Sequence, residues 1–291
     1  MELIRQAIEQ RLRGVTGTNE LNLDRPHGDP GLFGPGSMAW RVHGDFTAMM
    51  IGGVSALLLQ MLHPAALAGV WDHSNFRTDM AGRLRRTAQF ISGTTYGSAE
   101  QAARLIARVR AVHDHVHGSL PDGTPYSAND PALLNWVHVA ETSSFLQAHL
   151  RYREPWLSLA DQDRYFSEMA IIAERLGAQA VPRSRAQVLA YLHAMRPALH
   201  CDDRTREIAG IILSQPAPRA LAAPARAIVM DCAVDLLPRW ALDMHGLRIA
   251  GPRRYAARAA GHGIGAVARW AMRNGSARRA GRRMAVSTGN G

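Results

Sequence analysis

Two pairs of side chains in the middle of the sequence have spacings that suit metal binding. His113 and His117, in "AVHDHVHG", are four residues apart and would project from one face of a helix. His138 and Glu141, in "NWVHVAE", are three residues apart and would also share a face. Such pairs can chelate a metal ion, or a carboxylate can simply hold a histidine by a hydrogen bond. These four residues therefore allow a metal-dependent helical enzyme.

The same histidines also have structural interpretations. His115 and His117 would lie at a helix C-terminus, where exposed imidazoles interact well with the helix dipole. We therefore expect His113, which lies further from the end, to point inward. The glutamate of the HExxH hydrolase motif is missing, and a di-iron bundle would need several His/Glu pairs instead of one. A lone buried histidine such as His63 usually hydrogen-bonds a carbonyl group.

A third cluster could bind an anion. Arg83, Arg86 and Thr87, in "GRLRRTAQF", share one face of a predicted helix. Two guanidinium groups and a hydroxyl suit bidentate hydrogen bonding to a carboxylate or a phosphate. The alternative is a solvated basic face with local salt bridges to Asp72 or Asp79.

Helical periodicity dominates the elements that must position these residues. Residues 14–37 are rich in Gly, Pro, Asn and Asp and have no periodic apolar pattern. Gly118–Asp130 is a turn-rich linker that ends in good N-cap residues. Strict alternation over four to eight residues is missing, so a sheet is not expected, and the sequence predicts an all-α fold. The predicted helices cover residues 2–13, 44–62, 77–92, 98–117, 130–150, 160–176, 184–196, 203–213, 218–235 and 253–273.

The segment from Phe46 to Trp71 contains no charged residue and exceeds the roughly 20 residues that cross a bilayer. Gly52-Gly53, Gln60 and His63 would be unfavourable in lipid. Pro64 should end or kink the helix near residues 62–63. We therefore predict a buried central helix that is apolar on all sides, not a membrane span.

Composition limits the architecture and the chemistry. The 291 residues are compatible with one helical domain, in which we expect a core over 34–250 and a basic helix and tail over 251–291. The chain has no lysine, which excludes a P-loop and pyridoxal-phosphate chemistry. Its two cysteines and the missing secretory signal favour the cytoplasm.

Nine arginines and no acid lie between Gly251 and Gly291, so the rest of the chain carries little of the net charge of +10. We expect a solvated tail that aids solubility. Weak contact with an anionic membrane surface is the alternative. A specific nucleic-acid partner is not expected, because no module with stacking aromatic residues accompanies the arginines.

The sequence resembles the MpaB-type oxygenase family, which includes the haem-containing rubber oxygenases known as latex clearing proteins. The resemblance runs from about Gly34 to Leu247, and its specificity lies in the order of the motifs HP, HSxF, RxxRT, VH and WVH. The segments that carry it are "GPGSMAWRVHGD", "LLLQMLHPAALAGVWDHSNFRTDMAGRLRRT", "RVRAVHDHVHG", "DGTPYSANDPALLNWVH" and "LLPRWALDMHGL".

The resemblance implies a mostly helical enzyme that binds haem b and brings dioxygen to an apolar substrate. By motif, His113 would be the axial ligand of the iron, with His117 as the alternative because the HDHVH cluster permits two alignments. Arg83, Arg86 and Thr87 would lie at the haem edge or on its distal side. Without a CxxCH motif, the haem would be bound non-covalently.

Three further histidines match recurring positions of the family: His63, His73 and His138 would line the cofactor pocket or serve structural roles. Rubber-cleaving members resemble RxxKT, whereas this chain has Arg86 in place of the lysine. Arginine cannot donate a proton near neutral pH as lysine can. We therefore expect a small apolar or peptide-like intracellular substrate, not rubber.

Three functions remain in view. The first is a haem b-dependent oxygenase or oxidase with His113 as the iron ligand. The second is a haem-free metal enzyme that uses His113, His117, His138 and Glu141. The third is a non-catalytic helical protein whose apolar pocket carries a lipid-like ligand.

Overall fold

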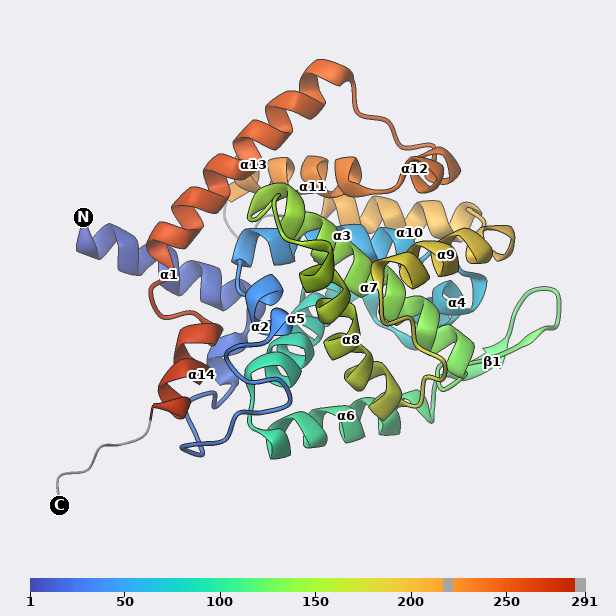
Figure 1. The fold of residues 1–291 in the computed structure, drawn as a ribbon. Helices are drawn as coiled ribbons and strands as arrows, with labels where there is room; N and C mark the ends of the chain where they lie inside the picture. The colour runs from blue at the N-terminus through green and yellow to red at the C-terminus, as the bar shows by residue number, and fades with distance from the viewer. Residues whose placement is uncertain (217–221, 286–291) are drawn as a thin grey trace.

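The computed structural model describes residues 1–216 and 222–285 (Figure 1). It confirms the predicted all-α fold, to which it adds a small two-stranded hairpin. Short 3-10 turns lie at Thr18–Glu20 and Arg196–Ala198. In chain order the helices are α1 (Glu2–Thr16), α2 (Met38–His43), α3 (Phe46–Gln60), α4 (Pro64–His73), α5 (Phe76–Tyr96), α6 (Ala99–His113), α7 (Pro131–Tyr152), α8 (Leu159–Leu176), α9 (Arg185–Met195), α10 (Asp203–Ser214), α11 (Ala223–Leu236), α12 (Arg239–His245), α13 (Gly251–Ala271) and α14 (Ser276–Met284).

Helix α3 is the central helix that the uncharged run predicts. It packs against α7, α11 and α13, and these partners surround it in Figure 1. Its N-terminus is fixed by the side chain of Asp45, which accepts a hydrogen bond from the amide of Ala48. Gly52 lets α7 approach closely, because a Cβ atom at this position would lie 3.0 Å from Cα of Phe145. The helix is therefore held by packing on several sides.

The chain breaks between α3 and α4, as Pro64 predicts. His63 is the N-cap of α4 and Pro64 occupies its first turn. The two helices are bent by 103° at the break. Within the described ranges, no helix is by itself long and apolar enough to cross a membrane; only the bent pair together meets that length and composition.

The predicted helix over 98–117 is wrong at its C-terminal end, because α6 stops at His113. The chain then forms a hairpin of β1 (His117–Ser119) and β2 (Pro125–Ser127), with His117 opposite Ser127. Gly123 makes the connecting turn with a φ of +86°, which favours glycine. Strands of three residues are too short to show an alternating pattern in the sequence. In β1, backbone pairing with β2 takes the place of the helical hydrogen bonds that were expected for these residues.

The basic C-terminal region is not a solvated tail over its described part. Helices α13 and α14 pack on the body, and six of the nine arginines form ion pairs with acids elsewhere in the chain. Arg283 is fully buried and donates to the carbonyls of Asp29, Leu23, Tyr96 and Gly97. The remaining part of the predicted tail, 286–291, lies outside the described residues.

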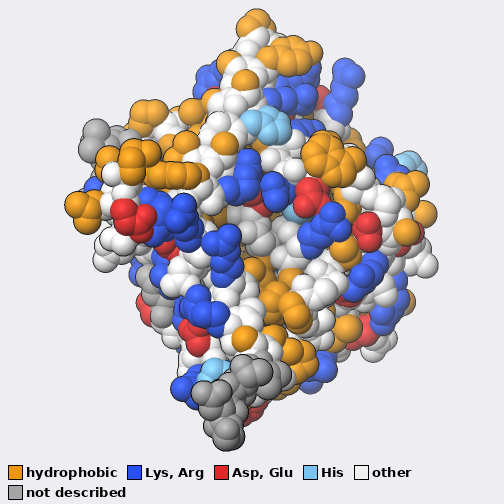
Figure 2. All heavy atoms as spheres, turned by 60° about the vertical axis from the view of Figure 1, so that its left-hand side comes forward, with side chains coloured by type: hydrophobic (Ala, Val, Ile, Leu, Met, Phe, Trp, Pro, Cys, Tyr) orange, Lys and Arg blue, Asp and Glu red, His pale blue; other side chains and the backbone are white. Residues whose placement is uncertain are grey.

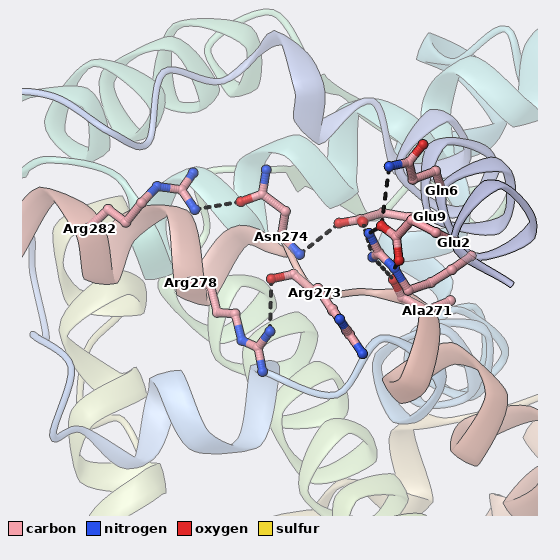
Figure 3. A network of polar contacts seen from close by, with 9 residues as sticks. Glu2, Gln6, Glu9, Ala271, Arg273, Asn274, Arg278 and Arg282 are labelled. Carbon is pink, nitrogen blue, oxygen red and sulfur yellow. Dashed lines mark hydrogen bonds and ion pairs between the residues drawn. The ribbon is translucent and has the colours of Figure 1, made fainter.

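The N-terminal helix α1 is hydrogen-bonded to the C-terminal region. Arg5 donates to the carbonyl oxygen of Ala271 over 3.1 Å. Glu9 accepts a hydrogen bond of 2.7 Å from the amide of Asn274 (Figure 3). These bonds tie α1 to the junction between α13 and α14.

The other differences concern helix ends and short helices. The predicted start of the 218–235 helix lies outside the described residues, and α11 is described from Ala223. Helices α2, α4, α12 and α14 were not predicted. They have six to ten residues, so they offer few turns over which a helical period can be recognised.

Candidate functional site

A cavity of about 560 Å³ lies beside the central helix, within the range of roughly 300–1,000 Å³ typical of ligand pockets. Helices α3, α5 and α7 form its walls, and α2, the end of α1 and the junction of α13 with α14 complete it. The large apolar side chains that line it are Phe46, Met49, Met50, Val54, Leu57, Leu84, Ile91, Phe145 and Met272.

Helix α5 presents a single stripe to the cavity. Leu84, Thr87, Ala88 and Ile91 line it, at the spacings of three and four that place side chains on one helical face. Thr87 is thus the member of the predicted Arg83/Arg86/Thr87 cluster that lines the cavity. Its hydroxyl donates to the carbonyl oxygen of Arg83 over 3.2 Å.

The two predicted arginines lie elsewhere around α5. The guanidinium of Arg83 is partly buried and donates to the hydroxyl of Ser74 over 2.9 Å, and burial lowers its pKa. Arg86 is exposed and pairs with Asp79 at 3.4 Å. This contact is the local salt bridge that the structural interpretation of the cluster predicts.

His43 lies in the wall of the cavity and uses both ring nitrogens within the protein. Its Nδ1 is 2.9 Å from the hydroxyl of Thr95, and its Nε2 is 2.9 Å from the hydroxyl of Tyr165. Complete burial lowers the pKa of His43 to about 3, so the imidazole is neutral. Both hydrogen bonds fix the ring, which gives this wall a rigid polar anchor.

Glu141 supplies a carboxylic acid to the cavity from α7. It is partly buried, and the loss of solvation raises its pKa to about 7. A hydrogen bond or ion pair from the described residues that would offset this effect is missing. Near neutral pH the group can therefore hold or release a proton inside an apolar space.

Two ion pairs also line the cavity. Arg41 contacts Glu154 at 2.8 Å, and Arg269 contacts Asp45 at 2.8 Å. The second pair links α13 to the N-cap of α3, since Asp45 also caps that helix. Both pairs are locally neutral, and they join segments that are far apart in sequence.

His149 lies close to the first of these pairs. It is almost completely buried, and neither ring nitrogen has a hydrogen-bond partner among the described residues. Its Nε2 is 3.6 Å from the carboxylate of Glu154, which is beyond hydrogen-bond distance. Burial lowers the pKa of His149, so the ring is kept neutral despite the nearby acid.

Of the predicted axial ligands, His113 is better suited than His117. His113 ends α6; its Nδ1 is buried without a partner in the described part of the chain, and burial lowers its pKa. His117 is exposed on β1. The expectation that both project from one helical face is therefore wrong, because the helix ends before His117.

The other predicted histidines have individual surroundings. His63 accepts a hydrogen bond from the amide of Ala65 through Nδ1, as an N-cap does. His73 contacts the hydroxyl of Tyr126 at 3.2 Å. His138 is buried in α7, and burial lowers its pKa to about 4. These three are not among the residues that line the cavity.

A metal site built from three or more His, Cys, Asp or Glu side chains is not formed by residues 1–216 and 222–285. The set His113, His117, His138 and Glu141 is therefore not brought together as a common ligand group. Glu141 faces the cavity, whereas His117 lies in the hairpin.

The donor groups differ in how well they suit a haem. The cavity has apolar walls and guanidinium groups, but its one lining histidine in the described structure, His43, has both nitrogens engaged. A neutral imidazole with an unpaired nitrogen is what an iron ligand requires, and His113 has this property. His113 does not line the cavity, so the described residues do not place an unpaired imidazole beside the apolar walls that a haem would need.

Sequence reasoning missed much of the cavity. His43 falls within the quoted segment "GPGSMAWRVHGD", and Glu141 was noticed only as the partner of His138. Arg41 and Asp45 fall within the same segment, but nothing in the sequence links them to Glu154 and Arg269. Their pairing depends on contacts between residues more than a hundred positions apart.

Comparison with known proteins gives one match. The family model described as "ER-bound oxygenase mpaB/B'/Rubber oxygenase, catalytic domain" matches residues 40–270. No curated protein and no solved structure matches the chain. The matched range extends from α2 to the end of α13 and so includes most of the residues that line the cavity.

Proposed function

The chain belongs to the mpaB/rubber oxygenase family, and from this we propose that it is an oxygenase that brings dioxygen to a small apolar substrate held in the cavity between α3, α5 and α7. The family supports an enzyme of the oxygenase type. The observation that carries the placement is the cavity itself, which combines long apolar walls with one unpaired acid, Glu141.

The apolar walls favour binding of a hydrocarbon-like molecule. Each apolar group that leaves water contributes about 25 cal/mol per Å² of buried surface. Phe46, Met49 and Leu57 of α3 and Phe145 of α7 contribute to these walls. The flexible methionine side chains can adapt to the shape of the substrate.

Glu141 is the proposed proton donor and acceptor of the site. Where a reaction with dioxygen includes a proton transfer, an acid is most effective when its pKa lies close to the working pH. Burial brings the pKa of Glu141 to about 7. Thr87, which also lines the cavity, is the proposed hydroxyl for hydrogen bonding to a polar atom of the substrate.

Haem b is the proposed cofactor, and His113 is the residue that would hold it. Haem b supplies an iron that activates dioxygen. The support is the family resemblance, together with the neutral, partly buried imidazole whose Nδ1 has no partner in the described structure. His113 lies outside the set of residues that line the cavity, so the proposal of haem b rests on the family resemblance and not on this cavity.

The cytoplasm is the proposed location, in keeping with the two free cysteines, Cys201 and Cys232. The described arginines of α13 and α14 are largely paired with acids, so only a weak contact with anionic membranes is proposed for this region.

The proposal is tested with ¹⁸O₂ and a panel of long-chain alkenes, alcohols and isoprenoids, with products analysed by mass spectrometry. We expect ¹⁸O in a product of the wild type. Ala88→Phe, which fills the cavity, should abolish incorporation. Ala81→Phe places the same side chain on the exposed face of α5 and should retain it. Binding of these compounds without ¹⁸O incorporation would instead identify a non-catalytic carrier.

A further inference from the structure

The distribution of charge along the cavity is uneven. Four arginines line it, but two of them are neutralised, Arg41 by Glu154 and Arg269 by Asp45. The other two, Arg153 and Arg278, are exposed and have no carboxylate partner among the described residues. Their exposure places them at the mouth of the cavity. The inner acid, Glu141, is more enclosed than either of them.

The two arginines reach the mouth from different elements. Arg153 directly follows the C-terminal end of α7. Arg278 lies in the first turn of α14 and donates to the carbonyl oxygen of Arg273 over 2.9 Å (Figure 3). That single bond leaves most of its five N–H groups available. Figure 2 shows the side of the molecule that carries α1 and α14, where arginine side chains border a hollow with hydrophobic side chains in its wall.

We propose that the molecule bound in this cavity is a long-chain carboxylate, with its hydrocarbon chain between α3, α5 and α7 and its anionic group at the mouth, which Arg153 and Arg278 line. This inference rests on the proposed function and names the class of its substrate. Guanidinium groups bind carboxylates through charge-assisted and often bidentate hydrogen bonds. The backbone N–H groups at the start of α14 add positive potential beside Arg278.

The inner acid also contributes to the orientation. Above about pH 7, where Glu141 is ionised, a carboxylate that entered head first would meet a like charge in an apolar space, where the repulsion is strong. With its head at the mouth, the same ligand leaves Glu141 to face the hydrocarbon chain. The arrangement therefore selects both the charge of the ligand and the direction in which it lies. It also brings an inner part of the chain, not the head group, next to the proton-donating acid.

The test compares three ligands of equal length: dodecanoate, dodecanol and dodecylamine. Each displaces the neutral fluorescent probe N-phenyl-1-naphthylamine from the purified full chain at pH 8 and low salt. We expect dodecanoate to bind about tenfold more tightly than dodecanol, a preference that added salt reduces. Dodecylamine should bind most weakly.

Two matched double variants distinguish the effect of the arginines at the mouth from the effect of lowering the net positive charge. Arg153→Gln/Arg278→Gln should bring dodecanoate to the affinity of dodecanol and leave dodecanol unchanged. Arg108→Gln/Arg175→Gln removes two exposed arginines that are not part of the cavity lining and should keep the preference. Equal affinities for carboxylate and alcohol in the wild type, or an equal loss in both double variants, would overturn the inference alone. A chain that binds neither the probe nor any of the three amphiphiles would overturn the proposed function as well.

Discussion

The Nε2 atom of His43 lies 2.9 Å from the hydroxyl oxygen of Tyr165, although 122 positions separate the two residues in the sequence. With Thr95 on the opposite ring nitrogen, this bond makes His43 a structural part of the cavity wall. A histidine at the edge of a large pocket would otherwise be an obvious candidate for an iron ligand. The two bonds therefore leave neither ring nitrogen of His43 available to a metal ion.

Replacing Tyr165 by phenylalanine should destabilise the fold. The change leaves a buried nitrogen of His43 without a partner, which costs about 1–3 kcal/mol. Urea unfolding measures the free energy of unfolding of the variant and of the wild type. Tyr191→Phe is the control, because the hydroxyl of Tyr191 makes only a long bond of 3.4 Å to Ala132. Equal effects of the two changes would contradict the role given to the His43–Tyr165 bond.

Glu141 should make stability depend on pH. Its pKa is raised in the folded protein to about 7 from an ordinary 4.5, so the folded state binds a proton more tightly than the unfolded state. This contribution is fully present below about pH 4.5 and is lost as pH rises through 7. Glu141→Gln should not lose stability over this pH range. At pH 8 its free energy of unfolding should therefore exceed that of the wild type, relative to the difference at low pH, by up to about 3 kcal/mol.

The measurement for Glu141 is thermal or urea unfolding of both proteins at several pH values between 4 and 9. A difference between them that stays constant over this range would refute the raised pKa. In assays of oxygen incorporation, the wild type should show a transition near pH 7. That transition should be absent from the residual activity of Glu141→Gln.

His113 should be required for haem binding. We expect the purified wild type to show a Soret band, since haem b is the proposed cofactor. His113→Ala should lose the band or show a clearly altered one, because the imidazole that would hold the iron is gone. His117→Ala, on the exposed hairpin, should keep the wild-type spectrum. Full haem loading with an unchanged spectrum in His113→Ala would reject this ligand.

Arg283 should anchor the C-terminal helix. Its buried guanidinium donates to four backbone carbonyls, at distances of 2.7–3.2 Å. Arg283→Met leaves these oxygens unpaired and should lower the free energy of unfolding by about 3 kcal/mol or more. Arg282→Met, at an exposed neighbouring position, should cost well under half of that. Thermal unfolding compares the two, and similar losses would argue against an anchoring role.

The sequence predicted the elements whose cause is local. The uncharged run gave the central helix, because the side chains of α3 are apolar on every face. Pro64 predicted the break before α4, and Asp130 predicted the start of α7. Both residues act on the backbone of their immediate neighbours. The ordered motifs identified the family that the match over 40–270 confirms.

The sequence did not reveal where α6 ends or how the arginines of α13 and α14 are used. The helical pattern continues through His117, but pairing of β1 with β2 captures that residue in a hairpin. Nine arginines without an acid were expected to form a solvated tail. In the fold, acids from distant segments, such as Asp24 and Asp235, neutralise several of them.

What the sequence determined by itself is thus a helical oxygenase-family chain with a buried central helix and a short set of candidate side chains. Tertiary structure alone decided which candidates meet: Thr87 and Glu141 line the cavity, whereas Arg86 faces solvent. Helical periodicity fixes which residues share a face, because it depends on neighbours three and four positions away. Whether that face meets the cavity or solvent depends on the packing of the whole chain. Whether each imidazole is hydrogen-bonded depends on partners that only the folded chain brings within reach.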